Sequence, residues 1–138
     1  MADTLKISEA ASLAMHTMAL LAEDPERVLS THQIATTLDA SEAHLSKVLQ
    51  RLAKAGLVTS IRGPRGGFLP AKRVDDVTLL EVYESIEGPI TPKTCLLNRR
   101  ICKGDGCILG DLLVRVNREV RDYLSGTKLS ELKPGNPS

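Results

Sequence analysis

The chain has 138 residues, of which 42% are hydrophobic and 25% charged, and this composition excludes a disordered chain. One compact domain, or one small domain with an appendage, is expected at this length. The formal net charge of +1 says nothing about partners, so the distribution of charge matters more. There is no apolar run of about 18 residues and no N-terminal secretory signal, so we expect a cytoplasmic protein without a membrane span.

Three helices are predicted in the first part of the chain. Residues 7–22 are apolar around most of a helix circumference, which predicts burial on several sides. Ser30 to Gln33 has the form of a capping box and predicts a short helix that follows. Ser41 is the expected N-cap of a third helix, which runs to about Ala55 and has Gly56 as its left-handed cap.

The pattern changes after the third helix. The short β-branched run 57–61, the turn residues 62–67 and the second run at Phe68–Leu69 predict a two-stranded hairpin. Three helices followed by a hairpin indicate a winged helix-turn-helix. The expected fold class is therefore mainly α with a small β-hairpin.

The rest of the chain is predicted to contain two further helices. A capping box at Thr78–Glu81 begins one that stops at Gly88. Residues 90–108 have no periodicity, and a long helix is expected from Leu109 to Gly126. We expect three parts: a winged helix-turn-helix DNA-binding domain at 1–89, a cysteine-bearing sensor loop at 90–108, and a dimerisation helix with its tail at 109–138.

Positive charge is concentrated on the third helix and the hairpin. Residues 43–74 contain seven Lys or Arg and no Asp or Glu, whereas residues 75–87 contain five acids and no base. A solvated basic helix face beside an unimportant turn is the simpler interpretation. The joint occurrence of the helical pattern, the hairpin and the acid-free window favours double-stranded DNA as the partner.

The third helix and the hairpin tip supply the candidate DNA contacts. The N-terminal end of the helix is best placed to reach base edges in a major groove, while Arg51 and Lys54 are expected at phosphates. The hairpin tip is glycine-rich, which suits close approach to DNA and an arginine in the minor groove. The predicted contacts are Ser41, Ala43, His44, Ser46, Lys47, Arg51, Lys54, Arg62, Arg65, Gly66 and Gly67.

The run from Leu45 to Val58, followed by the run from Arg62 to Phe68, resembles the winged-helix regulators of the Rrf2 family. The likeness extends over nearly the whole chain and is most specific at the second run. It implies a homodimeric transcription factor that binds a pseudo-palindromic operator. It also implies that Arg62 enters a minor groove and that the long C-terminal helix dimerises.

The long helix has an apolar stripe that fits a dimer interface on its own terms. The stripe would be too exposed if only a small winged domain packed on it, although an intramolecular core helix is the alternative. The expected interface residues are Leu109, Leu112, Leu113, Val116, Val120, Tyr123 and Leu124.

The three cysteines Cys95, Cys102 and Cys107 lie within thirteen positions. Their odd number and close spacing favour a ligand or redox cluster over a disulfide framework. Clustered thiolates suit an iron–sulfur cluster or zinc, and a metal-free thiol switch is a third interpretation. Cluster-binding members of the resembled family carry three cysteines in this loop, which implies an iron–sulfur cofactor here.

The fourth ligand departs from the family pattern. One branch has a histidine three residues after the last cysteine, where this chain has Gly110, and another uses an acidic residue of the partner's first helix, where this chain has Ser12. The first cysteine interval is also one residue longer than is usual. The remaining candidates for the fourth ligand are Glu9, His16, Asp105, Asp111 and an exogenous ligand. The choice between a 2Fe–2S and a 4Fe–4S cluster therefore stays open.

The sequence as a whole predicts a DNA-binding transcriptional regulator that senses iron–sulfur status, nitric oxide or redox stress. A cluster-free or zinc-binding regulator, controlled by thiol oxidation or a partner protein, is the alternative. No arrangement typical of an enzyme site occurs, and an enzyme would leave the basic window unexplained.

Overall fold

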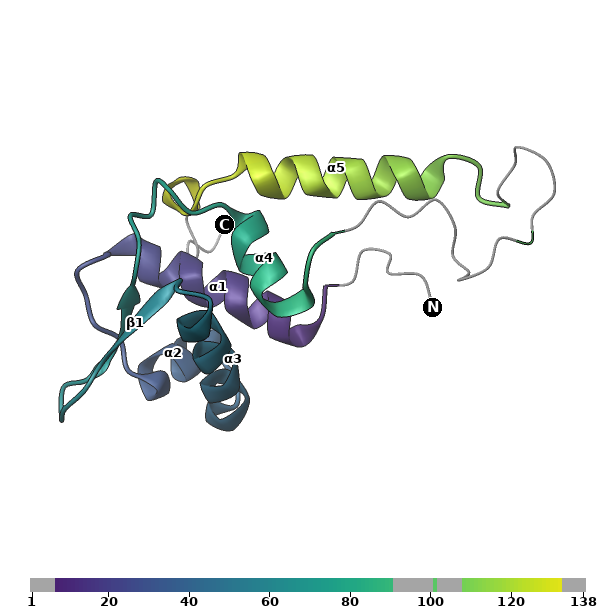
Figure 1. Ribbon diagram of the computed structural model, residues 1–138. Helices are drawn as coiled ribbons and strands as arrows, with labels where there is room; N and C mark the ends of the chain where they lie inside the picture. Colours follow the sequence, from purple (N-terminus) through teal and green to yellow (C-terminus); the bar gives the residue numbers. More distant parts are fainter. Residues whose placement is uncertain (1–6, 91–100, 102–107, 133–138) are drawn as a thin grey trace.

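The computed structural model describes residues 7–90, 101 and 108–132, which form a helical body with one hairpin and a long C-terminal helix (Figure 1). None of the described helices is long and apolar enough to cross a membrane. The elements in chain order are α1 (Glu9–Glu23), α2 (Thr31–Leu38), α3 (Glu42–Lys54), β1 (Val58–Ile61), β2 (Gly67–Pro70), α4 (Leu79–Glu87), α5 (Leu112–Gly126) and the 3-10 turn η1 (Leu129–Glu131). The expected fold class is confirmed.

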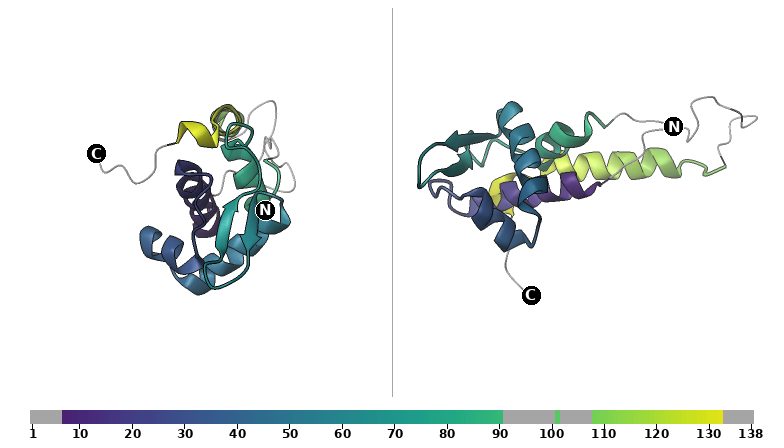
Figure 2. Two further views of the ribbon diagram at one scale, coloured as in Figure 1. Left: turned by 90° about the vertical axis from the view of Figure 1, so that its left-hand side faces the viewer. Right: turned by 90° about the horizontal axis from the view of Figure 1, so that it is seen from below.

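Helix α1 lies at the centre of the body and contacts α2, α3, α4, β2 and η1 (Figure 2). The hydroxyl of Ser8 caps it by accepting a hydrogen bond from the Ala11 amide at 3.0 Å. Apolar residues on several sides of α1 are buried, as its nearly continuous apolar composition predicts. Met18 and Leu21 are among the largest fully buried side chains of the described chain.

Local signals place α2 and α3 as expected. The Ser30 hydroxyl and the Gln33 side chain form a reciprocal capping box at the start of α2. Asp39 adopts the left-handed conformation, with φ at 52°, and turns the chain toward Ser41, whose hydroxyl caps α3. Gly56 follows α3 with φ at 78°, which a residue with a side chain rarely adopts.

The hairpin is antiparallel, with Val58 opposite Pro70 and Ile61 opposite Gly67. Its outer edge is also paired, because Leu29 and Phe68 exchange two backbone hydrogen bonds of 2.8 and 3.2 Å. The chain before α2 thus forms an isolated antiparallel β-bridge with β2, and this bridge holds the hairpin against the helix-turn-helix.

Helix α4 begins with the predicted capping box of Thr78 and Glu81. Helix α5 begins at Leu112, three residues later than its apolar stripe predicts, because Gly110 has a φ of 63° in the preceding turn. Leu109 therefore precedes the helix on which it was placed.

The chain after α5 returns to the body. The Leu79 amide donates to the Thr127 carbonyl and the Leu129 amide to the Val77 carbonyl, both at 2.9 Å. Leu129 is completely buried in the core. The C-terminal end of α5 is consequently held to the winged body, whereas its N-terminal end extends beyond it (Figure 1).

Candidate nucleic-acid interface

Helix α3 has one face in the core and the opposite face open to solvent. Its apolar stripe, Leu45, Val48, Leu49 and Leu52, is buried. At 3.6 residues per turn, the opposite face carries Ala43, Lys47, Gln50 and Lys54, all of which are exposed. Gln50 was not among the predicted contacts, although its position between the two lysines on this face would have identified it.

The N-terminal end of α3 is tied to its neighbours. The Ser41 hydroxyl accepts from the His44 amide at 3.3 Å, so this oxygen serves the helix cap. The His44 ring lies 3.6 Å from the Glu9 carboxylate, and Glu42 contacts His32 of α2 at 2.7 Å. Ser46 is half-buried on the flank of the helix. These contacts fix how the reading end of α3 is presented, and they place two carboxylates close to it.

The seven basic residues of the 43–74 window divide into two groups. Four are exposed and form neither an ion pair nor a side-chain hydrogen bond with any described residue; they are Lys47, Lys54, Arg62 and Arg65. Lys72 pairs with Glu81 at 3.7 Å. Arg73 pairs with Asp75 at the same distance. The unpaired cations therefore come from the outer face of α3 and the tip of the hairpin.

Arg51, the seventh basic residue, is directed toward α4. Its Nη2 donates to the Ile86 carbonyl at 2.5 Å. This carbonyl belongs to the last turn of α4, where carbonyls lack helical partners and the helix dipole favours a cation. The structure therefore shows Arg51 joining α3 to α4, and its contact with a phosphate stays a prediction.

The hairpin tip presents Arg62 and Arg65 on a tight turn closed by a 2.9 Å hydrogen bond from the Gly66 amide to the Gly63 carbonyl. A Cβ on Gly66 would lie 2.2 Å from the Ile61 carbonyl oxygen, and a Cβ on Gly67 would lie 2.2 Å from that of Leu29. Both glycines are thus required by close backbone contacts within the protein itself.

The tip and α3 project from the side of the molecule opposite α5 (Figures 1 and 2). A shallow groove separates the start of α2 from the hairpin; it is lined by Ser30, Thr31, His32, Ser60, Ile61, Arg62, Gly63, Gly66, Gly67 and Phe68. The sequence did not indicate this groove, because it depends on the contact between Leu29 and β2.

The predicted metal ligands Cys95, Cys102 and Cys107 lie outside the described residues. Within the described ranges, no group of three or more His, Cys, Asp or Glu side chains is placed to hold a metal ion. Ser12 is half-buried on α1, and Gly110 lies in the turn before α5. Neither position offers a side chain suited to be the fourth ligand of a cluster.

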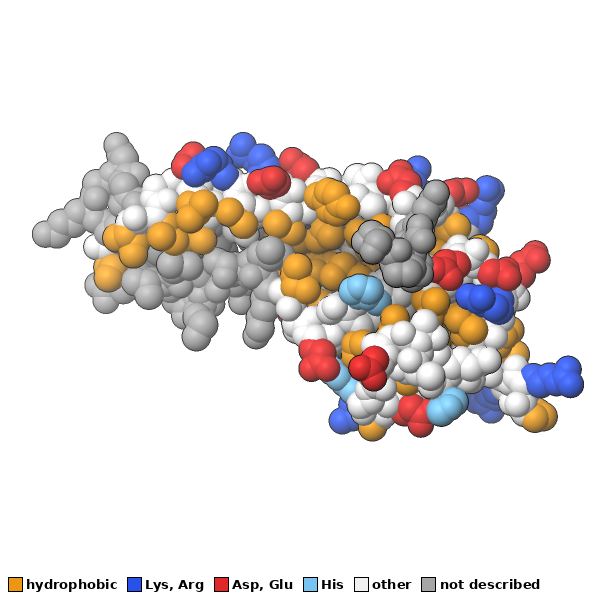
Figure 3. Space-filling view, turned by 180° about the vertical axis from the view of Figure 1, so that it is seen from behind, with side chains coloured by type: hydrophobic (Ala, Val, Ile, Leu, Met, Phe, Trp, Pro, Cys, Tyr) orange, Lys and Arg blue, Asp and Glu red, His pale blue; other side chains and the backbone are white. Residues whose placement is uncertain are grey.

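The predicted dimer stripe divides on α5. Leu124 is 8% exposed and belongs to the core, and Val120 packs against it. Leu112, Val116 and Tyr123 are 42%, 37% and 64% exposed. Their spacing puts them on one face of the helix, which we call the apolar band of α5. Figure 3 shows apolar side chains gathered in a band along one face of the molecule. Part of the stripe therefore serves the chain's own core, and part remains uncovered.

Residues 7–134 match the Rrf2 family, which is described as "Iron-dependent Transcriptional regulator". The chain belongs to the Rrf2 family. This membership establishes a DNA-binding transcriptional regulator with a helix-turn-helix, and it places the chain among regulators rather than enzymes.

Individual relatives within the Rrf2 family agree with this assignment. CymR of Bacillus subtilis is 32% identical over 93% of this chain and 89% of its own. Its solved structure, described as the global cysteine regulator, superposes with a TM-score of 0.77 at 30% identity over 92% of this chain and 95% of that one. IscR of Pectobacterium atrosepticum is 31% identical over 67% of this chain, which spans 56% of that longer protein.

Proposed function

We propose that this Rrf2 regulator reads its operator with the outer face of α3 and the tip of the hairpin. The observation that carries the proposal is the division of the basic window: the four cations of this window that have neither an ion pair nor a side-chain hydrogen bond among the described residues all come from these two elements. A surface whose cations are unpaired binds phosphates without first breaking internal ion pairs.

The two elements have separate tasks in this proposal. The first turns of α3, with Ala43, His44, Ser46 and Lys47, enter the major groove, where base pairs present distinct donors and acceptors. Lys54, at the far end of the same helix, meets the phosphate backbone. The hairpin tip places Arg62 in the adjacent minor groove, and Arg65 follows the backbone beside it.

Two copies of the chain are proposed to bind together through the apolar band of α5. A two-fold symmetric pair of winged domains reads two half-sites, which accounts for the pseudo-palindromic operator that the family resemblance implies. The exposed Leu112, Val116 and Tyr123 support this arrangement, because a single chain leaves them uncovered.

The proposed DNA surface is tested by binding measured as a function of salt. An operator is first recovered by selecting bound duplexes from a random-sequence pool. Lys54→Ala and Arg65→Ala, which remove the two proposed phosphate contacts, are each expected to lower the slope of log affinity against log salt by about 0.9, the value for one lost phosphate contact. Arg115→Ala, an exposed cation on α5, is the matched control. Wild-type slopes for both test variants would contradict the proposal.

The sensing part of the proposal rests on the three cysteines. Cys95, Cys102 and Cys107 would hold an iron–sulfur cluster, which supplies a centre whose oxidation, nitrosylation or loss changes its charge and ligation. The description of the family as iron-dependent supports this assignment. A change at the cysteines would reach the DNA-binding elements through the chain itself. The loop 90–108, which carries the cysteines, begins at Ile90, and the Ile90 amide donates a 3.0 Å hydrogen bond to the Glu84 carboxylate of α4.

The alternative is a regulator without a cluster, controlled by thiol oxidation or by a partner protein, and the likeness to a global cysteine regulator favours it as the second candidate. Anaerobic purification, an absorption spectrum and iron and sulfide analysis separate the two. We expect a coloured protein that contains iron and sulfide and loses both when Cys102 is changed to Ser. A colourless protein that resists reconstitution would contradict the cluster.

A further inference from the structure

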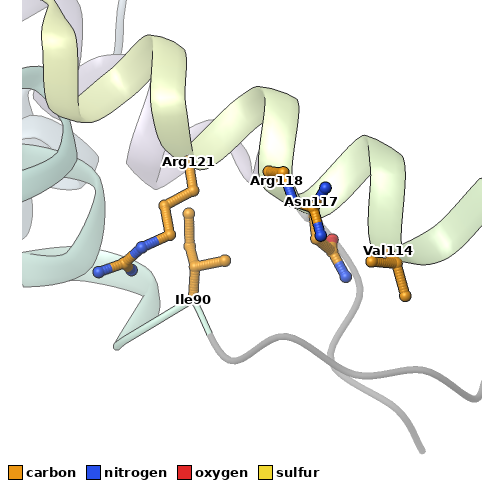
Figure 4. Close-up of a pocket in the computed structure, with 5 residues that line it drawn as sticks. All are labelled: Ile90, Val114, Asn117, Arg118 and Arg121. Atoms are coloured by element: carbon orange, nitrogen blue, oxygen red, sulfur yellow. The ribbon is translucent and has the colours of Figure 1, made fainter.

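A cavity of about 190 Å³ lies beside α5, on the side where α4 leads into Ile90 (Figure 4). The described residues that line it are Ile90, Val114, Asn117, Arg118 and Arg121. The four α5 residues follow the spacing of one helix face, and at 3.6 residues per turn this face is opposite that of Leu112, Val116 and Tyr123. The cavity therefore stays accessible when the apolar band is covered.

Asn117 is the buried polar group of this cavity. The residue is only 4% exposed, and its Nδ2 has no hydrogen-bond partner among the residues that the structure describes. Figure 4 shows the Asn117 side chain projecting from α5 toward the side on which Ile90 lies. A buried amide without a partner destabilises the fold by about 1–3 kcal/mol unless a bound group satisfies it. An acceptor oxygen in the cavity would satisfy it.

The charge around the cavity is positive. Arg118 is exposed and forms no ion pair with any described residue, whereas Arg121 lies 3.9 Å from the Glu84 carboxylate. The same Glu84 oxygen accepts a 3.0 Å hydrogen bond from the Ile90 amide. Arg121 thus shares the Glu84 carboxylate with the Ile90 amide, and the positive charge of Arg118 has no counter-ion among the described residues.

We propose that this cavity binds a small organic monoanion, with one carboxylate on a compact apolar body. The carboxylate accepts from the Asn117 amide and the Arg118 guanidinium, and the apolar body packs on Ile90 and Val114. An engineered apolar cavity of about 150 Å³ holds benzene, so a space slightly larger than this suits a ligand of about seven non-hydrogen atoms. The proposal depends on neither DNA binding nor a cluster.

Titration calorimetry of the full-length protein with 3-methylbutanoate tests the site. We expect saturable one-site binding with a Kd of about 1 mM or below. The neutral analogue 3-methylbutanol, which keeps the apolar body and lacks the charge, is expected to bind at least tenfold more weakly. Inorganic phosphate tests whether a charge alone suffices, and no saturation is expected with it.

Variants identify the cavity as the place of binding. Arg118→Gln and Asn117→Leu are each expected to weaken binding of 3-methylbutanoate about tenfold, the effect of one lost charge-assisted hydrogen bond. Arg115→Gln, on the same helix but outside the cavity, is the matched control and should bind as the wild type does. Thermal unfolding verifies that each variant is folded, and Arg118→Gln removes an exposed group that the fold does not need.

The proposal is overturned if 3-methylbutanoate shows no saturable binding, or if Arg118→Gln binds it as tightly as the wild type. Equal affinity for 3-methylbutanol, or saturation by phosphate at the same concentration, would overturn the assignment to an apolar carboxylate.

Discussion

Helices α3 and α5 have the same kind of sequence, an apolar stripe with charges on the remaining faces, but their stripes differ in how far the rest of the chain buries them. The stripe of α3 is covered by its own chain from end to end. The stripe of α5 is covered only near its C-terminal end, at Val120 and Leu124, and is left open at Leu112, Val116 and Tyr123.

The difference shows that periodicity establishes which face of a helix is apolar but does not identify what covers that face. For α3, the other helices of the compact body fill the available positions. For α5, the body ends before the helix does (Figure 1). Mutations in the two stripes should therefore affect different quantities, namely the stability of the monomer in α3 and the association of two chains in α5.

The largest effect is expected from Leu52→Ala in α3. Leu52 is fully buried, so the variant loses transfer free energy and leaves a cavity, and we expect the free energy of unfolding to fall by about 2–5 kcal/mol. Chemical denaturation at fixed protein concentration measures the loss. A loss below about 1 kcal/mol would show that the α3 stripe is less well packed than the structure indicates.

The next effect is expected from Val116→Glu in α5, which puts a charge into the apolar band. Association of two chains should weaken at least about thirtyfold, or about 2 kcal/mol, because a central interface residue becomes charged. Sedimentation velocity over a range of concentrations measures this, with Asp122→Ala on the polar face as the control. A Val116→Glu variant that dimerises as tightly as the wild type would show that the apolar band is not the dimer interface.

A smaller effect is expected from Arg51→Ala, which removes the bond to the last turn of α4. Because the side chain is exposed, the unfolding free energy should fall by only about 1–1.5 kcal/mol, at the lower end for a hydrogen bond to a charged group, while the salt slope of operator binding stays unchanged. Denaturation and salt-dependent binding are both needed. A lowered salt slope with an unchanged unfolding free energy would show instead that Arg51 contacts a phosphate, as the sequence predicts.

The smallest change in stability is expected from Lys54→Ala, one turn from Arg51 on the exposed face. The side chain is exposed and unpaired among the described residues, so the unfolding free energy should stay within about 0.5 kcal/mol of the wild type. The salt slope should fall by about 0.9. Together, Arg51 and Lys54 test whether the charges of one helix divide into structural and DNA-binding groups.

Most of the fold follows from short-range signals in the sequence. The capping boxes at Ser30 and Thr78, the cap at Ser41 and the left-handed Gly56 each act over a few residues, and the structure confirms all four. Residues far apart in the chain carry no such signal. The pairing of Leu29 with Phe68 could not be predicted for that reason, and it emerges only from the assembled fold.

The candidate site divides in the same way. Composition identified the basic window, and helical spacing separated the outer face of α3 from its buried stripe. The Arg51 bond to the Ile86 carbonyl depends on where α4 ends, thirty-five residues further along the chain, so helical spacing alone could not predict it. The start of α5 at Leu112 was missed, because the apolar stripe continues into the turn at Gly110.

The backbone bonds of Thr127 and Leu129 give α5 the mechanics of a lever with a fixed pivot. At 1.5 Å per residue, its fifteen residues reach about 22 Å from that pivot. A tilt of about 5° would displace the N-terminal end of the helix, which follows the cysteines in the sequence, by about 2 Å and would hardly move its C-terminal end. Conversely, a displacement of about 2 Å at the N-terminal end of α5 corresponds to a rotation of about 5° relative to the winged body. The length of α5 therefore determines how large a rotation a given displacement produces.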